Sequence, residues 1–226
     1  MRWHLILVAL FAAVASGACP ATINTISLDS DTSLVTVEGP LVATDADQFK
    51  TKTASISKAL VMLVSDGGNL YTGLQIGETI RLKNFASFVP DGSRCASACA
   101  LAWLGGTKRL MGKNSQIGFH SASDFKTGNI SSAGDALIGA YLNKIGIPER
   151  VIVYVTSPSP SEIQWLNLED AKNLGLDVEI FTAPSIYGSL EQPNLNTASL
   201  FPIINEIALN SDELETANRL ARDFYL

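Results

Sequence analysis

The sequence predicts an α/β fold with repeated strand–helix–strand turns, on the strength of three observations. The continuous apolar run at residues 59–64 lacks polar alternation, which is typical of a parallel strand covered on both faces. A glycine pair at Gly67-Gly68 ends this run, and apolar residues at a helical period follow over 70–81. Further strand-like and helix-like segments alternate along the chain, and this alternation favours the α/β class.

The other elements follow from periodicity and from turn residues. Residues 96–103 are apolar on nearly all sides, which predicts a buried helix, and Gly105-Gly106 would end it. Residues 149–155 fit a helix, although their Val and Ile content also allows a strand. Strands are expected at 23–28, 34–37, 86–89, 108–111, 116–120 and 176–181. Further helices are expected at 45–60, 131–144 and 168–174, with a Pro/Asn/Ser-rich linker at 183–197 and a helical tail at 200–226.

The N-terminus has the pattern of a secretory signal peptide over residues 1–18. Arg2 provides the positive charge, a short apolar core follows, and small residues precede Cys19. The apolar core is too short for a comfortable membrane span, and a buried first helix is the alternative. We therefore expect an exported protein, periplasmic or secreted, with a domain over 19–182 and an extension over 183–226. Lipid anchoring at Cys19 is a minor alternative, because Ser16 occupies the position where a lipobox has a Leu-like residue.

Composition narrows the class of protein. The 226 residues are 46% hydrophobic, which suffices for the core of one globular domain. The formal net charge is −6 and no basic run occurs, so we do not expect a nucleic-acid partner.

The three cysteines suggest a disulfide, because an exported chain meets an oxidising compartment. Cys95 and Cys99 could bridge if Cys95 lies just outside a helix. A bond from Cys19 to one of them is the rival pairing. A metal site is not expected, since His120 is the only histidine left after processing and C-x-x-x-C is a weak zinc signal.

Three features could carry chemistry, and each also has a purely structural interpretation. Gly67-Gly68 could direct backbone N–H groups at an anion, or it could be a plain tight turn. Ser97 could be a nucleophile at a helix start, or a small residue that allows close packing. His120 ends the apolar strand Ile117-Gly118-Phe119 and could act as a general base or fill a structural position.

Read together, these residues resemble the Clp-type caseinolytic serine peptidases and the wider ClpP/crotonase superfold, which includes the signal peptide peptidase A group. The shared pattern is a buried strand ending in S-x-G-G, then a helix-start Ser, then a strand-end His. The resemblance is greatest to exported Clp-peptidase-like proteins of bacteria, which combine a signal sequence with a C-A-S-A-C-A-L segment and a G-x-H strand. It covers roughly residues 33–182, including a closing segment at 168–181. It implies ClpP/crotonase-like stacked βαβ turns with a helical C-terminal extension.

The resemblance also assigns roles to residues. Ser97 matches the nucleophile and His120 the general base. Gly68, with Gly67, and Ala98 match the amides of the oxyanion hole. Two departures stand out: Asp66 replaces a proline beside the hole, and Ile163 occupies the position of the third, acidic member. Glu162 is the adjacent carboxylate, one step away.

The implied function is an exported serine hydrolase, a peptidase acting on peptides or proteins without a metal or organic cofactor. Related folds form rings or trimers, which implies a homo-oligomer, and an exported protein lacks the ATP for an ATPase partner. A Ser-Lys dyad using Lys108, Lys113 or Lys126 is a rival mechanism. A catalytically silent binding or scaffold protein is the alternative function, and acyl-CoA chemistry a weaker third.

Overall fold

The computed structural model describes residues 19–124 and 126–181, so the expected signal peptide at 1–18 and the linker and tail at 183–226 lie outside the described residues. The strands are β1 (Thr22–Ser27), β2 (Thr32–Glu38), β3 (Lys58–Val64), β4 (Ala86–Val89), β5 (Arg94–Ala96), β6 (Arg109–Gly112), β7 (Gln116–Phe119), β8 (Gln164–Trp165) and β9 (Glu179–Phe181). The helices are α1 (Asp45–Thr53), α2 (Leu70–Leu82), α3 (Ala98–Leu104), α4 (Ser132–Lys144), α5 (Glu149–Thr156) and α6 (Leu168–Leu174).

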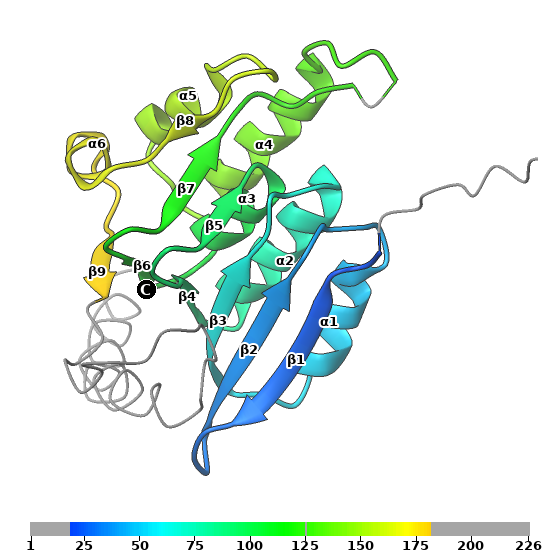
Figure 1. Ribbon diagram of the computed structural model, residues 1–226, viewed down its shortest axis with the longest axis vertical. Helices are drawn as coiled ribbons and strands as arrows, with labels where there is room; N and C mark the ends of the chain where they lie inside the picture. Colours follow the sequence, from blue (N-terminus) through cyan, green and yellow to red (C-terminus); the bar gives the residue numbers. More distant parts are fainter. Residues whose placement is uncertain (1–18, 125, 182–226) are drawn as a thin grey trace, which may run out of the picture.

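The larger sheet has the strand order β1-β2-β3-β4-β6-β9 and is parallel except for the β1–β2 hairpin. Helices α1, α2 and α3 lie side by side on one of its faces (Figure 1). Strand β3 explains the non-alternating apolar run: Val61 and Leu63 join the core beneath these helices, while Leu60 and Met62 join a second apolar cluster. Both faces of the strand are therefore buried, and the expected α/β class is confirmed.

A second, smaller sheet has the order β5-β7-β8, with β5 and β7 parallel and β8 antiparallel to β7. It is joined to the larger sheet just after β3. The Ser65 N–H donates to the Arg94 carbonyl, and the Ala96 N–H donates to the Ser65 carbonyl, both at 2.9 Å. Because of this junction, the glycine turn after β3 lies beside the end of β5.

Helix α3 is the centre of the core, since each of its residues is at most 4% exposed. It packs closely on α2: a Cβ added at Gly73 would lie 2.3 Å from the Ala98 carbonyl oxygen. The one indole on the helix, that of Trp103, donates to the Leu110 carbonyl at 3.1 Å, so its buried N–H is satisfied. Helix α3 thus starts at Ala98 in fixed surroundings.

Several sequence-based boundaries were wrong, and pairing between segments distant in the chain explains those at β5 and β8. The helix expected over 96–103 begins at Ala98, because residues 94–96 form β5 against β7. The helix expected over 45–60 ends at Thr53, because the chain turns before β3 begins. Strand β8 was not expected, and it exists through its pairing with β7. Residues 149–155 are helical, which resolves the alternative left open there.

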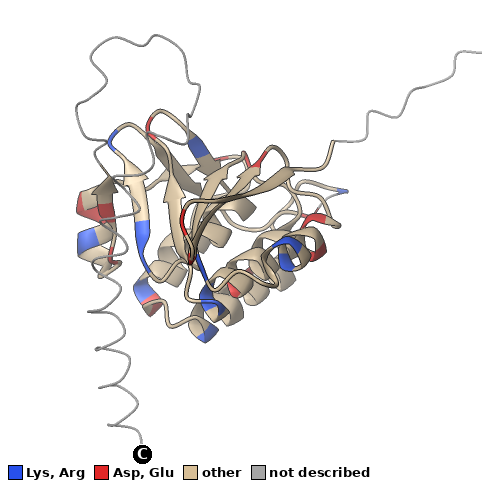
Figure 2. Ribbon diagram, turned by 90° about the horizontal axis from the view of Figure 1, so that it is seen from below, with Lys and Arg blue, Asp and Glu red and all other residues tan. Residues whose placement is uncertain are grey.

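The surface carries mixed charge. Lys and Arg residues lie on several separate elements, with Asp and Glu residues among them (Figure 2). No helix within the described ranges is long and apolar enough to cross a membrane.

Candidate functional site

Ser97 occupies the sharp turn between β5 and α3, and its backbone is strained. Its φ of 54° and ψ of −125° lie outside the regions that L residues normally adopt. Asn84 is the other non-glycine residue with positive φ in the described part of the chain. Such a conformation costs about 1–3 kcal/mol and persists where the surroundings enforce it, which is common at active sites. A serine on a strained strand-to-helix turn is also the geometry that exposes a nucleophilic hydroxyl.

The turn is held from two sides. The Ser97 N–H donates to the Gly118 carbonyl on β7 at 2.8 Å, and the Ser97 carbonyl accepts the first helical bond from Leu101 at 3.1 Å. On the other side, a Cβ at Gly67 would lie 2.8 Å from the Ser97 Cβ and 3.1 Å from the Ala98 nitrogen. Position 67 must therefore be glycine for the β3 turn to approach Ser97 this closely.

The structure separates the roles of the two glycines. The Gly67 N–H donates to the Ser65 Oγ at 3.0 Å, so this amide is occupied, which corrects the expectation that Gly67 could supply an oxyanion-hole donor. Gly68 is exposed, and within residues 19–124 and 126–181 neither its N–H nor that of Ala98 donates to a protein acceptor. Gly68 and Ala98 remain the candidate donors.

Ser65 is a contributor that sequence reasoning missed. It is 5% exposed, and its hydroxyl holds the glycine turn through the Gly67 N–H. The S-x-G-G pattern contains this serine, and the signal was its position two residues before Gly67, the spacing of a side-chain-to-backbone turn.

Asp66 does not direct its charge at the turn. Its carboxylate pairs with the Arg94 guanidinium at 3.4 Å, and both side chains are largely exposed. The replacement of proline by a carboxylate is therefore compatible with an anion near Gly68, because Arg94 offsets the negative charge.

His120 follows the end of β7 and is half-buried. Its Nδ1 lies 2.7 Å from the Ser121 carbonyl oxygen. Since a carbonyl can only accept, Nδ1 carries the proton, and in a neutral ring Nε2 holds the free lone pair. The parallel register pairs Ala96 with Gly118, so Ser97 and His120 leave adjacent strands at the same end of the small sheet. No hydrogen bond joins the Ser97 hydroxyl to His120 among the described residues.

Among the described residues, no hydrogen bond or ion pair joins His120 to Glu162, the carboxylate proposed as third member. Glu162 is exposed, and its N–H donates to the Ser159 carbonyl at 3.0 Å in a turn. The antiparallel register pairs Gly118 with Trp165 and Phe119 with Gln164, so Ile163 is the residue that continues the ladder opposite His120. The acid expected at Glu162 is thus displaced by one position, and the Ser121 carbonyl is the group that orients the imidazole.

A hollow of about 690 Å³ lies between the end of α5 and β8. It is lined by Tyr154, Ser157, Pro158, Glu162, Ile163 and Gln164. The Ser121 N–H donates to the Pro158 carbonyl at 2.9 Å, which ties this hollow to the end of β7. Burial raises the pKa of the Tyr154 phenol, which donates to the Trp165 carbonyl at 3.2 Å. The hollow therefore combines apolar walls, one carboxylate and protonated hydroxyls.

Cys95 and Cys99 form a disulfide that brackets Ser97, whereas Cys19 is an exposed free thiol. The rival pairing with Cys19 is therefore wrong. No group of three or more His, Cys, Asp or Glu residues that could hold a metal ion occurs in the described ranges.

The lysines of the rival dyad lie elsewhere. Lys108 pairs with Glu179 at 3.9 Å across the larger sheet, while Lys113 and Lys126 are exposed. None of the three has a hydrogen bond to Ser97 within the part of the chain that the structure describes.

Comparisons with known proteins give structural similarities only. No family model matches the chain, and no curated protein sequence matches it. Among solved structures, a serine-to-alanine mutant of the 1510-N membrane-bound stomatin-specific protease is similar, with 16% identity and a TM-score of 0.48, over 65% of this chain and 77% of that one. A lysine-to-alanine mutant of the same protease, in complex with a substrate peptide, gives 18% identity and a TM-score of 0.48, over 65% and 73%.

Proposed function

We propose that this protein is an exported serine hydrolase that cleaves peptides or proteins, with Ser97 as its nucleophile. The observation that carries the proposal is the backbone of Ser97, whose φ of 54° and ψ of −125° place a half-buried hydroxyl on a strained strand-to-helix turn. A small packing residue has no need of this conformation, and its cost is compensated where it aims a reactive group.

In the proposed reaction, the Ser97 Oγ attacks a substrate carbonyl and the His120 Nε2 takes the hydroxyl proton. The tetrahedral oxyanion then accepts hydrogen bonds from the Gly68 and Ala98 N–H groups. Each such donor contributes about 3–4 kcal/mol in the transition state when it is correctly placed. The imidazolium passes its proton to the leaving amine, and water repeats the sequence on the acyl-enzyme.

The orienting group in this proposal is the Ser121 carbonyl. It fixes the tautomer in which Nε2 is basic, as the acid of a Ser-His-Asp triad does. A neutral carbonyl stabilises the imidazolium less than a carboxylate would, so we expect a slower enzyme than one with a complete Ser-His-Asp triad.

The proposal also includes export, a ClpP/crotonase-like arrangement and a homo-oligomeric state. Export is supported by the N-terminal pattern and by the Cys95–Cys99 disulfide, since disulfides persist in oxidising compartments. The order of the glycine turn, Ser97 and His120 supports the ClpP/crotonase-like arrangement. A homo-oligomer without an ATPase partner remains part of the proposal.

A second candidate is a catalytically silent binding protein with the same fold. It is favoured by one observation: Ile163, and not an acid, continues the ladder opposite His120. In that case the hollow lined by Tyr154, Ile163 and Gln164 would bind a peptide without any cleavage.

The test is covalent labelling by a fluorophosphonate probe, read by intact mass and by peptide mapping. We expect one adduct on Ser97, none in Ser97→Ala, and slower labelling in His120→Ala. Circular dichroism of both variants would verify that they fold. A wild-type protein that stays unlabelled at pH 8 over hours, or that labels equally in Ser97→Ala, would refute the hydrolase and leave the binding protein.

A further inference from the structure

We propose that the Cys95–Cys99 disulfide is a positioning device that holds Ser97 in its reactive conformation. The inference rests on the proposed function for its catalytic consequence, but the conformational part can be measured without any activity. Cys95 lies two residues before Ser97 and Cys99 two residues after it. The disulfide therefore closes a short loop with Ser97 at its centre.

The bond closes the reversal of the chain between β5 and α3. The two Cα atoms are 5.2 Å apart, although four extended residues would span about 13 Å. Cys95 belongs to β5 and Cys99 to α3, so the disulfide joins the strand to the helix on either side of Ser97. Straightening at Ser97 would separate the two sulfur atoms and is therefore blocked while the bond is intact.

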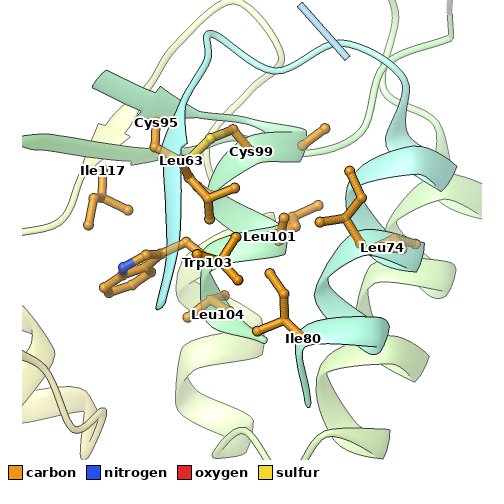
Figure 3. Packing of buried hydrophobic residues seen from close by; sticks show 14 of the residues in the cluster. Leu63, Leu74, Ile80, Cys95, Cys99, Leu101, Trp103, Leu104 and Ile117 are labelled. Atoms are coloured by element: carbon orange, nitrogen blue, oxygen red, sulfur yellow. A yellow bond between two sulfur atoms is a disulfide. The ribbon is translucent and has the colours of Figure 1, made fainter. Parts of the chain in front are cut away.

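The disulfide, which we call the brace, is buried and is held by its neighbours in the core. Cys95 is 0% and Cys99 1% exposed. Figure 3 shows the disulfide in the core with Leu63 of β3 and Ile117 of β7 close to it. Cys95 is also paired in register with Ile117, and it forms a bridge with Ser65 at the end of β3. The strand end of the bond is thus anchored to both sheets.

Other restraints on Ser97 are weaker. Its N–H donates to the Gly118 carbonyl, its carbonyl accepts from the Leu101 N–H, and Gly67 blocks movement from one side. Neutral hydrogen bonds each contribute little net free energy, and they are lost as soon as the turn opens. A covalent link over such a short loop restricts the unfolded chain only modestly, so its main effect falls on the turn itself.

The test compares the oxidised and the reduced form of one protein, which differ only in the sulfur–sulfur bond. A dithiol such as dithiothreitol gives two electrons and two protons to the disulfide, leaving two thiols on the protein and a cyclic disulfide on the reagent. A Cys19→Ala background makes the count of alkylatable thiols after unfolding unambiguous: none in the oxidised form, two in the reduced form.

Two measurements are made on each form. The first is amide hydrogen exchange, for which we expect at least tenfold faster exchange at Ser97 after reduction, with Val61 of β3 as the internal reference. The second is the rate of fluorophosphonate labelling as a function of probe concentration. After reduction we expect the limiting rate to fall at least tenfold, with little change in the probe concentration that gives half of the limiting rate. Val35→Ala, a core change in β2 away from the turn, controls for general destabilisation and should leave the limiting rate unchanged.

The outcomes separate the two proposals. Equal exchange at Ser97 and equal labelling in both forms would overturn the brace. Faster exchange at Ser97 in a protein that is never labelled would support the brace and refute the hydrolase. A Cys95→Ala, Cys99→Ala protein that folds and behaves like the reduced form would exclude an effect of the reductant itself.

Discussion

Replacement of Gly67 by alanine tests the close approach on which the candidate site depends. Gly67 has a φ of +98°, and its Cβ would lie 2.7 Å from the Ala96 carbonyl oxygen and 2.8 Å from the Ser97 Cβ. The positive φ costs an alanine about 1–2 kcal/mol, and relief of the backbone contacts adds about 1–3 kcal/mol. We therefore expect Gly67→Ala to lower the free energy of unfolding by about 2–5 kcal/mol.

The same change should reduce reactivity, because the methyl group pushes directly on Ser97. Displacement of a reacting group by about 1 Å costs about 10²-fold in rate, so labelling by the fluorophosphonate probe should fall by about that factor. The free energy of unfolding would be measured by urea titration. Labelling would be followed at pH 8 in buffer without urea, where the variant is folded.

Gly146→Ala is the matched control. Gly146 has a φ of +76°, and no atom lies within 4 Å of its added Cβ, so this variant carries the backbone strain without the contacts. We expect a loss of only about 1–2 kcal/mol and wild-type labelling. If Gly67→Ala and Gly146→Ala have the same free energy of unfolding and the same labelling rate, close packing of Gly67 on the Ser97 turn is refuted.

Three further variants test the site and the fold. Ile163→Asp should place a carboxylate opposite His120, so we expect at least tenfold faster labelling by the fluorophosphonate probe. An unchanged labelling rate would contradict the register. Glu162→Gln should leave the labelling rate within twofold of wild type, because this side chain is exposed and forms no hydrogen bond or ion pair with His120 in the described ranges. A tenfold fall would place its carboxylate in the site. Hydrogen bonds from the Asp31 and Thr32 backbone lower the pKa of Asp29, so this carboxylate stabilises the β1–β2 hairpin above its unfolded pKa and ceases to do so as pH falls through the folded value. Asp29→Asn should therefore have a lower urea midpoint than wild type at pH 7, and this difference should shrink below pH 4; a constant difference would exclude the linkage.

The sequence predicted the parts of the site that depend on local pattern. The apolar run before Gly67 identified β3, and the run after Ser97 identified a buried helix, because both faces of these elements are apolar. It did not predict β5, which is three residues long and exists through pairing with β7. Without β5, the strained turn at Ser97 could not be foreseen, and the Cys95–Cys99 bond could be predicted only on the condition that Cys95 lies outside a helix.

The orienting group of His120 was beyond sequence reasoning for a different reason. A side chain can be recognised by its type, which is why Glu162 was considered, but a backbone carbonyl is present at every residue. The Ser121 carbonyl acquires its position from the way the chain leaves β7. The same holds for the Gly67 N–H, whose bond to the Ser65 hydroxyl becomes visible only when the turn is folded.

The burial of α3 limits how this protein can change over evolution. Every residue of the helix is at most 4% exposed, so substitutions that retune Ser97 from within the helix also alter the core. By contrast, Glu162, Ile163 and Gln164 are exposed, and they line the hollow beside α5. Substitutions around Glu162 should therefore cost little stability, whereas substitutions in α3 that would reach the Ser97 turn are constrained by the core.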